Sequence, residues 1–168
     1  MSQASVETTK QTSGTRKPGP EHNRLDVFVG KWNMEGQQYE GIVGPAAKVS
    51  AVRTYEWLSG GLFLIHRYEG KVSDAEAACI EVIGHDPSSQ RYFLRSFYND
   101  GKTNYWQATV DENIWLQTGD WEMDGEAMKV RCTIEFSEDG NTMTGKWEHS
   151  IDGSTWETFW DVRATKQV

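Results

Sequence analysis

The chain has 168 residues, a formal net charge of −8 and a high share of aromatic side chains, with eight Trp, six Tyr and six Phe. That length fits one domain with a sizeable core. An acidic chain without a basic run is unsuited to nucleic acid or to an anionic membrane surface, and no apolar run is long enough for a transmembrane helix.

The first segment, residues 1–20, is rich in Ser, Thr, Gly and Pro and has almost no large apolar side chains. It cannot bury enough surface to offset the entropy of ordering, so we predict a disordered tail before a domain over residues 21–168. The segment also lacks the apolar stretch of a secretory signal, which makes a cytoplasmic location the default expectation. In a reducing cytosol, Cys79 and Cys132 are expected to be free thiols.

A short helix is predicted from Asn23 to Val29. Leu25, Phe28 and Val29 are spaced at i, i+3 and i+4, as on one face of a helix. Asn23 can cap the start of this helix, and Gly30 can end it. The remainder of the chain needs no other helix.

The rest of the domain alternates between extended segments and short groups of Gly, Asn and Asp, which accept the positive φ of hairpin turns. About ten strands joined in this way make an antiparallel up-and-down meander. Such a meander exposes two edges unless it closes, so we predict an all-β barrel. The predicted strands are Lys31–Glu40, Lys48–Leu58, Gly61–Lys71, Ala77–His85, Arg91–Tyr98, Lys102–Val110, Ile114–Trp121, Ala127–Phe136, Thr142–Ile151 and Trp156–Ala164.

The period of two assigns an inward face to three of these strands. The inward sets are Val49, Ala51, Arg53, Tyr55 and Trp57, then Met128, Val130, Cys132, Ile134 and Phe136, then Met143, Gly145, Trp147, His149 and Ile151. Parity alone therefore carries Arg53 and His149 into the barrel together with the apolar residues.

Turn chemistry predicts which inward residues lie opposite one another. A two-residue loop at Ser59–Gly60 would place Tyr55 opposite Leu64 and Arg53 opposite His66. A slip in the turn would undo this register.

The turns on either side of the strand that carries His149 predict the neighbours of this histidine. A type II′ loop at Gly153–Ser154 would place it opposite Thr158, and Trp147 opposite Trp160. A four-residue loop over residues 138–141 would place Val130 on its other side.

Arg53 and His66, with Tyr55 and Tyr68 beside them, form the first candidate site. A guanidinium fork suits a carboxylate or phosphate, so Arg53 could hold the acidic group of a ligand. The alternative is an Arg that is satisfied by a buried carboxylate or by backbone carbonyls, or that reaches the barrel mouth.

His149 with Thr158 forms the second candidate site. This histidine could contact a ligand, act as a general base, or ligate a metal or haem. The alternative is a core histidine bonded to a hydroxyl group. No second ligand stands at metal spacing, and the common catalytic signatures are absent from the sequence, so neither metal nor cofactor is predicted.

The opening of the domain resembles that of the lipocalin-like superfamily (calycins), in which a short helix precedes Gly-x-Trp at the first strand. Here that motif is Gly30-Lys31-Trp32. In calycins this Trp packs under an Arg of the last strand, so the resemblance assigns Arg163 to Trp32, with cation–π stabilisation. Simple parity, however, turns Arg163 outward.

Residues from about Leu25 to Thr165 also resemble a bacterial family catalogued as domain of unknown function 1579, notably in "YEWLSGGLFLIHRYEG" and "GHDPSSQRYFLRSFYNDG". The resemblance implies a calycin-like barrel and no activity. Haem-binding nitrobindins open with Gly-x-Trp-x-Gly-x-Gly, from which the stretch Gly30–Gly36 departs, so the resemblance does not favour haem.

Three classes of function remain open. Ten strands can leave an interior that side chains do not fill, so the first is a binder of a small hydrophobic or amphipathic molecule. Its expected contacts are Arg53, Tyr55, Trp57, His66, Tyr68, Trp147, His149 and Thr158. The second is an enzyme with His66 or His149 as the acid–base group, and the third is a ligand-free interaction module. Apolar groups on both faces of two middle strands leave a homodimer open.

Overall fold

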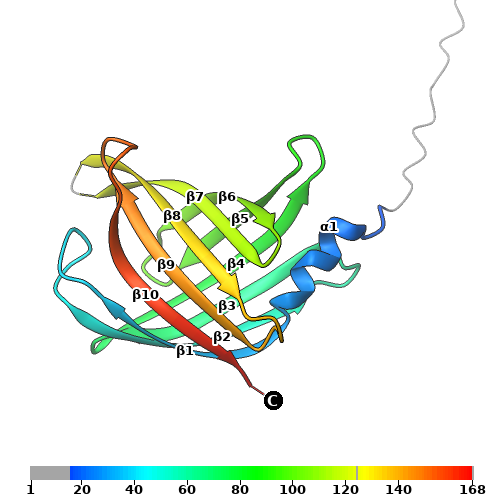
Figure 1. Cartoon of the computed structure of the whole chain (residues 1–168), viewed down its shortest axis with the longest axis horizontal. Helices are drawn as coiled ribbons and strands as arrows, with labels where there is room; N and C mark the ends of the chain where they lie inside the picture. Colours follow the sequence, from blue (N-terminus) through cyan, green and yellow to red (C-terminus); the bar gives the residue numbers. More distant parts are fainter. Residues whose placement is uncertain (1–15, 124, 168) are drawn as a thin grey trace, which may run out of the picture.

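The computed structural model describes residues 16–123 and 125–167, and its ten strands form a closed barrel (Figure 1). The strand order around the barrel is β1-β10-β9-β8-β7-β6-β5-β4-β3-β2, and every neighbouring pair is antiparallel. The all-β meander predicted from the turns is thus confirmed. The elements are α1 (Pro20–Asn23), η1 (Arg24–Val27), β1 (Gly30–Gln38), β2 (Ala47–Trp57), β3 (Phe63–Val72), β4 (Ala75–Asp86), β5 (Arg91–Tyr98), β6 (Thr103–Asp111), β7 (Ile114–Met123), β8 (Glu126–Phe136), β9 (Thr142–Ser150) and β10 (Glu157–Lys166).

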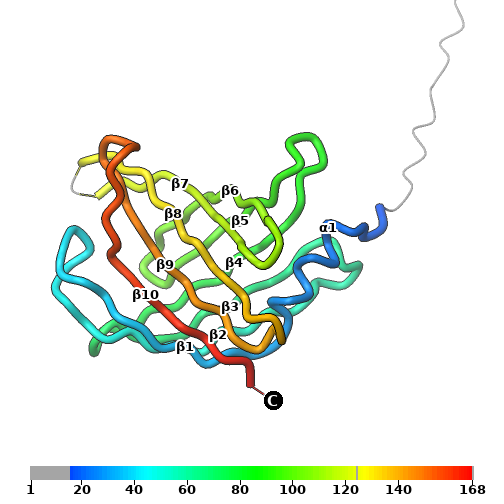
Figure 2. Tube along the Cα trace, in the orientation of Figure 1, coloured from blue at the N-terminus to red at the C-terminus, as the bar shows by residue number. Residues whose placement is uncertain are grey.

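Each of the ten predicted strands overlaps one observed strand. The chain passes from strand to neighbouring strand through short turns, as the trace in Figure 2 shows. β1 and β10 then pair from Trp32 opposite Lys166 to Gln38 opposite Trp160, and this pairing closes the barrel. Of the predicted tail, residues 1–15 lie outside the described residues.

The helical segment begins earlier than predicted, at Pro20 rather than Asn23. Proline suits the first position of a helix because its φ is already helical. His22 supports this start, since its Nδ1 accepts a hydrogen bond from the backbone N–H of Gly19 at 3.0 Å. Asn23 makes no side-chain cap. Gly30, with φ of +125°, begins β1 after the helical segment has ended.

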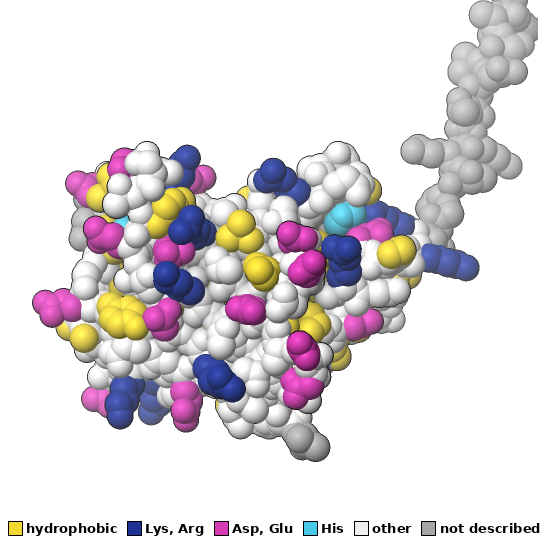
Figure 3. Space-filling model, in the orientation of Figure 1, with side chains coloured by type: hydrophobic (Ala, Val, Ile, Leu, Met, Phe, Trp, Pro, Cys, Tyr) yellow, Lys and Arg dark blue, Asp and Glu magenta, His cyan; other side chains and the backbone are white. Residues whose placement is uncertain are grey.

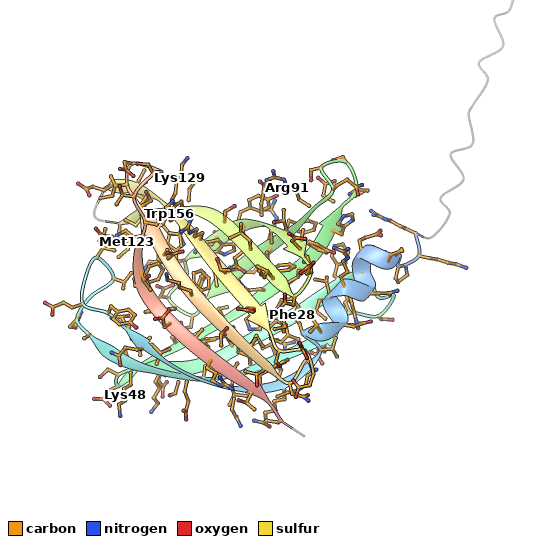
Figure 4. The ribbon with its side chains drawn as sticks, in the orientation of Figure 1. Phe28, Lys48, Arg91, Met123, Lys129 and Trp156 are labelled. Atoms are coloured by element: carbon orange, nitrogen blue, oxygen red, sulfur yellow. The ribbon has the colours of Figure 1, made fainter. Side chains whose placement is uncertain are left out.

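The helical segment covers one end of the barrel, where Figure 4 places Phe28. Leu25 and Phe28 are buried, and the Phe28 ring lies 4.8 Å from that of Phe136 and 5.2 Å from those of Tyr55 and Trp115. This end is therefore filled by apolar side chains. Neither helical segment of the described chain has the length and apolarity needed to span a membrane.

The cation above Trp32 is a lysine, so the assignment of Arg163 was wrong. Lys166 Nζ lies 5.0 Å from the centre of the Trp32 ring, whereas Arg163 is exposed opposite Glu35. Side chains on a strand point alternately to its two faces. Lys166 therefore lies on the same inward face of β10 as Ala164, whereas Arg163 points outward.

The β2–β3 hairpin has a longer loop than predicted. The backbone N–H of Leu58 donates to the carbonyl of Phe63, so four residues form the loop. The register consequently moves by two positions, which places Tyr55 opposite His66 and Arg53 opposite Tyr68. A shift of two residues keeps every side chain on its predicted face.

The β8–β9 hairpin confirms Val130 as a partner of His149. The β9–β10 hairpin confirms Trp160 as the partner of Trp147, but it does not place Thr158 opposite His149. A bulge between Thr158 and Trp160 places Thr158 opposite Glu148 and Glu157 opposite His149. Ile151, predicted inward, lies beyond the end of β9 and is 65% exposed.

Candidate functional site

Four polar side chains lie inside the barrel on consecutive strands. Arg53 comes from β2, His66 from β3, Glu81 from β4 and Ser96 from β5, and all four are buried. Glu81 is the cross-strand partner of both His66 and Ser96, so the ladder itself brings three of them together. The sheet register thus creates a polar cluster in a largely apolar interior.

A chain of hydrogen bonds connects this cluster to the aromatic core. His66 Nδ1 lies 2.5 Å from Glu81 Oε2, and the Ser96 hydroxyl donates to Glu81 Oε1 at 2.6 Å. The indole N–H of Trp106 donates to Ser96 Oγ at 3.1 Å. Both carboxylate oxygens of Glu81 therefore accept a hydrogen bond, which fixes the carboxylate and the His66 ring together.

The protonation states follow from burial and these bonds. Burial raises the pKa of Glu81, but the hydrogen bonds from His66 and Ser96 outweigh burial and hold that pKa below its usual value. Burial also lowers the pKa of His66, and the nearby Glu81 only partly offsets this. His66 is accordingly neutral at pH 7, with its proton on Nδ1, and Glu81 is ionised.

Aromatic rings fix the geometry of the two basic side chains. The Tyr55 ring stacks on the His66 ring, with centres 4.2 Å apart and planes 5° apart. Arg53 Cζ lies 5.7 Å from the centre of the Tyr68 ring. Both rings belong to the predicted site, so the structure brings Arg53, Tyr55, His66 and Tyr68 together.

Three polar atoms of this cluster have no hydrogen-bond partner among the described residues: Arg53 Nε, His66 Nε2 and the Tyr68 hydroxyl. A buried polar atom without a partner costs about 1–3 kcal/mol, and native proteins contain few of them. Two further buried atoms, Nδ1 of His85 and Nδ1 of His149, also lack partners but belong to other surroundings. Three such atoms on two adjacent strands make this cluster the candidate site.

A small cavity lies beside Arg53. Its volume is about 10 Å³, enough for one water molecule. The space beside Arg53 is thus too small for an organic ligand unless side chains move. The cavity is lined by Arg53, Cys132, Ile134, Met143, Gly145, Trp147, Val162 and Ala164.

Indole rings fill the interior from the polar cluster toward the end opposite the helix, where Figure 4 places Met123 and Trp156. Trp106 lies 5.5 Å from Trp147 and 5.9 Å from Trp121, measured between ring centres. Trp121 in turn lies 5.5 Å from Phe159. Trp147 therefore stands between the cavity beside Arg53 and this aromatic cluster.

The remaining predicted site residues do not join the cluster. Trp57 lies at the helix end, where its indole N–H donates to Asp26 Oδ1 at 2.8 Å. His149 is buried beside Phe159, and its Nε2 lies 3.9 Å from the exposed carboxylate of Glu157. Thr158 is displaced by the bulge described above.

The family described as protein of unknown function (DUF1579) matches residues 17–159. The chain belongs to this family. Its fold resembles the crystal structure of Rv2717c from M. tuberculosis, with a TM-score of 0.63, 10% identity, and coverage of 89% of this chain and 99% of that chain. At that identity the likeness extends to the barrel fold alone. No curated protein matches the chain.

Sequence reasoning missed Glu81, Ser96 and Trp106. β4 and β5 carry apolar residues on both faces, so alternation could not choose an inward side for Glu81 or Ser96. Only the register identifies them: the β3–β4 pairing places Glu81 opposite His66, and the β4–β5 pairing places Ser96 opposite Glu81. A search for the carboxylate partner of a buried His or Arg would have been the one available signal.

The charged side chains on the outside are interspersed. On the face that Figure 3 shows, Lys and Arg alternate with Asp and Glu over the strands. Elsewhere on the outer surface Phe97 and Tyr105 are about half exposed, on the neighbouring strands β5 and β6. The homodimer stays a prediction.

Proposed function

We propose that the barrel binds a small amphipathic molecule whose anionic group is held by Arg53. The three unpartnered atoms carry this proposal: Arg53 Nε, His66 Nε2 and the Tyr68 hydroxyl. A carboxylate, sulfonate or phosphate offers several acceptor atoms and a charge that complements a guanidinium. A reducing cytoplasm remains the proposed location, and the two free thiols, Cys79 and Cys132, fit it.

The apolar part of this ligand would lie among the indole rings beyond Arg53. Sites for small molecules usually have volumes of about 300–1,000 Å³, far above the 10 Å³ beside Arg53. Entry therefore requires side chains to move, and Trp147 is the first to do so because it lines the cavity and faces the aromatic cluster. Binding should consequently change the tryptophan fluorescence of the protein.

Arg53→Met should weaken binding of anilinonaphthalene sulfonate, an anionic aromatic probe, by about tenfold to 100-fold, the worth of a charged hydrogen bond. The matched control is Arg95→Met on the outside of β5, where Arg95 Cζ lies 4.9 Å from the centre of the Tyr105 ring. Fluorescence titration measures both affinities, and circular dichroism checks that the variants fold. Equal affinities of the two variants would refute the role of Arg53.

An enzyme is the second candidate, and the His66–Glu81 pair favours it. Glu81 orients the ring through Nδ1 and leaves Nε2 as an unpartnered base, which is the arrangement of a general base. Any turnover found in a broad substrate screen should fall at least 100-fold in His66→Gln. Turnover that survives this change would exclude His66 as the base.

A further inference from the structure

The polar cluster holds one positive and one negative charge. The titratable groups that act on Arg53 and Glu81 are Tyr55 from β2, His66 and Tyr68 from β3, Cys79 from β4, Tyr98 from β5 and Cys132 from β8. Burial raises the pKa of Tyr55 and that of Cys79 to about 12. It also raises the pKa values of Tyr68, Tyr98 and Cys132. All five groups are therefore neutral at pH 7. Only Arg53 and Glu81 remain charged, and their charges balance.

His66 is the one group of the cluster that can change this balance near neutral pH. Its ring cannot turn freely, because Tyr55 stacks on it and Glu81 holds Nδ1. Burial is the main effect that lowers the pKa of His66 and so disfavours the protonated ring in the unliganded protein, and the positive charge of Arg53 adds to it.

An anion beside Arg53 reverses this situation. The ligand would add an uncompensated negative charge to a buried site, which is costly in a medium of low polarity. A protonated His66 would restore neutrality, with two positive and two negative groups. Its Nε2–H would also become a donor toward the ligand, which gives this unpartnered atom a use.

We propose that the anion enters the barrel together with one proton, which Nε2 of His66 takes up. This inference rests on the proposed function, because it assumes that the acidic group lies at Arg53. The ligand is therefore an anion for which the affinity falls as the pH rises. The fall approaches tenfold per pH unit wherever His66 is neutral in the free protein and protonated in the complex.

The test uses anilinonaphthalene sulfonate, because a sulfonate stays ionised and cannot itself take the proton. Calorimetric titration at pH 7 in two buffers of different ionisation enthalpy measures the protons taken up per bound probe. We expect uptake that approaches one proton in the wild-type protein and none in His66→Gln, whose amide can still donate to Glu81. The uncharged analogue phenylnaphthylamine should bind without proton uptake.

The outcomes separate the two proposals. Binding that is weakened by Arg53→Met but involves no proton uptake in the wild-type protein overturns this inference and leaves the proposed function standing. Uptake that persists in His66→Gln also overturns it, because the proton then goes elsewhere. A probe that does not bind, or that binds Arg53→Met as well as the wild type, contradicts the proposed function and this inference together.

Discussion

Glu81→Leu is expected to lower the free energy of unfolding by about 3–5 kcal/mol, the usual cost of leaving a buried charge without its compensation. Glu81 is a buried carboxylate whose negative charge acts on Arg53, and it accepts hydrogen bonds from His66 and Ser96. Leucine fills a similar volume but satisfies none of these groups. Denaturant unfolding followed by circular dichroism measures the loss, and Glu56→Leu on the exposed outside of β2 should change stability by less than about 0.5 kcal/mol.

The double variant Arg53→Met/Glu81→Leu identifies the cause of that loss. If the uncompensated Arg53 charge is responsible, removal of both charges should recover much of the stability, because apolar side chains often replace buried ionic groups at little cost. The double variant would then be more stable than Glu81→Leu alone. Losses that simply add would show that Arg53 does not depend on Glu81.

The faces of the strands could be predicted, whereas the neighbours within the cluster could not. Arg53 and His66 are both inside as expected, although the β2–β3 register differs by two residues. A register shift of two residues keeps each side chain on its face of the sheet but changes every cross-strand pair. The loop after Leu58 contains two glycines, which permit both the predicted two-residue turn and the observed four-residue turn.

Other parts of the site depend on tertiary features that leave no local signal. The bulge in β10 moves Thr158 away from His149, and no residue type demands a bulge there. Glu81 lies on a strand whose two faces are equally apolar. The volume beside Arg53 could not be predicted for a related reason, since strand number sets the width of a barrel while large side chains such as Trp147 decide how much of that space stays open.

Trp32→Ala should lower the free energy of unfolding by about 3–5 kcal/mol. Trp32 is completely buried on β1, the strand whose pairing with β10 closes the barrel. Its indole N–H donates to the Phe28 carbonyl at 2.7 Å, so the same side chain also attaches the helical segment to the barrel. Truncation would leave a large cavity and remove this attachment. Denaturant unfolding followed by far-UV circular dichroism measures the change without depending on tryptophan fluorescence.

Two milder substitutions separate the contributions of Trp32. Trp32→Phe keeps most of the apolar volume and removes the hydrogen bond, so we expect a loss of about 1–2 kcal/mol, less than for alanine. A loss equal to that of alanine would mean that the bond to Phe28, rather than packing, dominates. Lys166→Met removes only the cation above the ring and should cost about 0.5–1 kcal/mol. Arg163→Met should be nearly neutral because Arg163 is on the outer face, and a larger loss for Arg163 than for Lys166 would contradict the observed assignment of the cation.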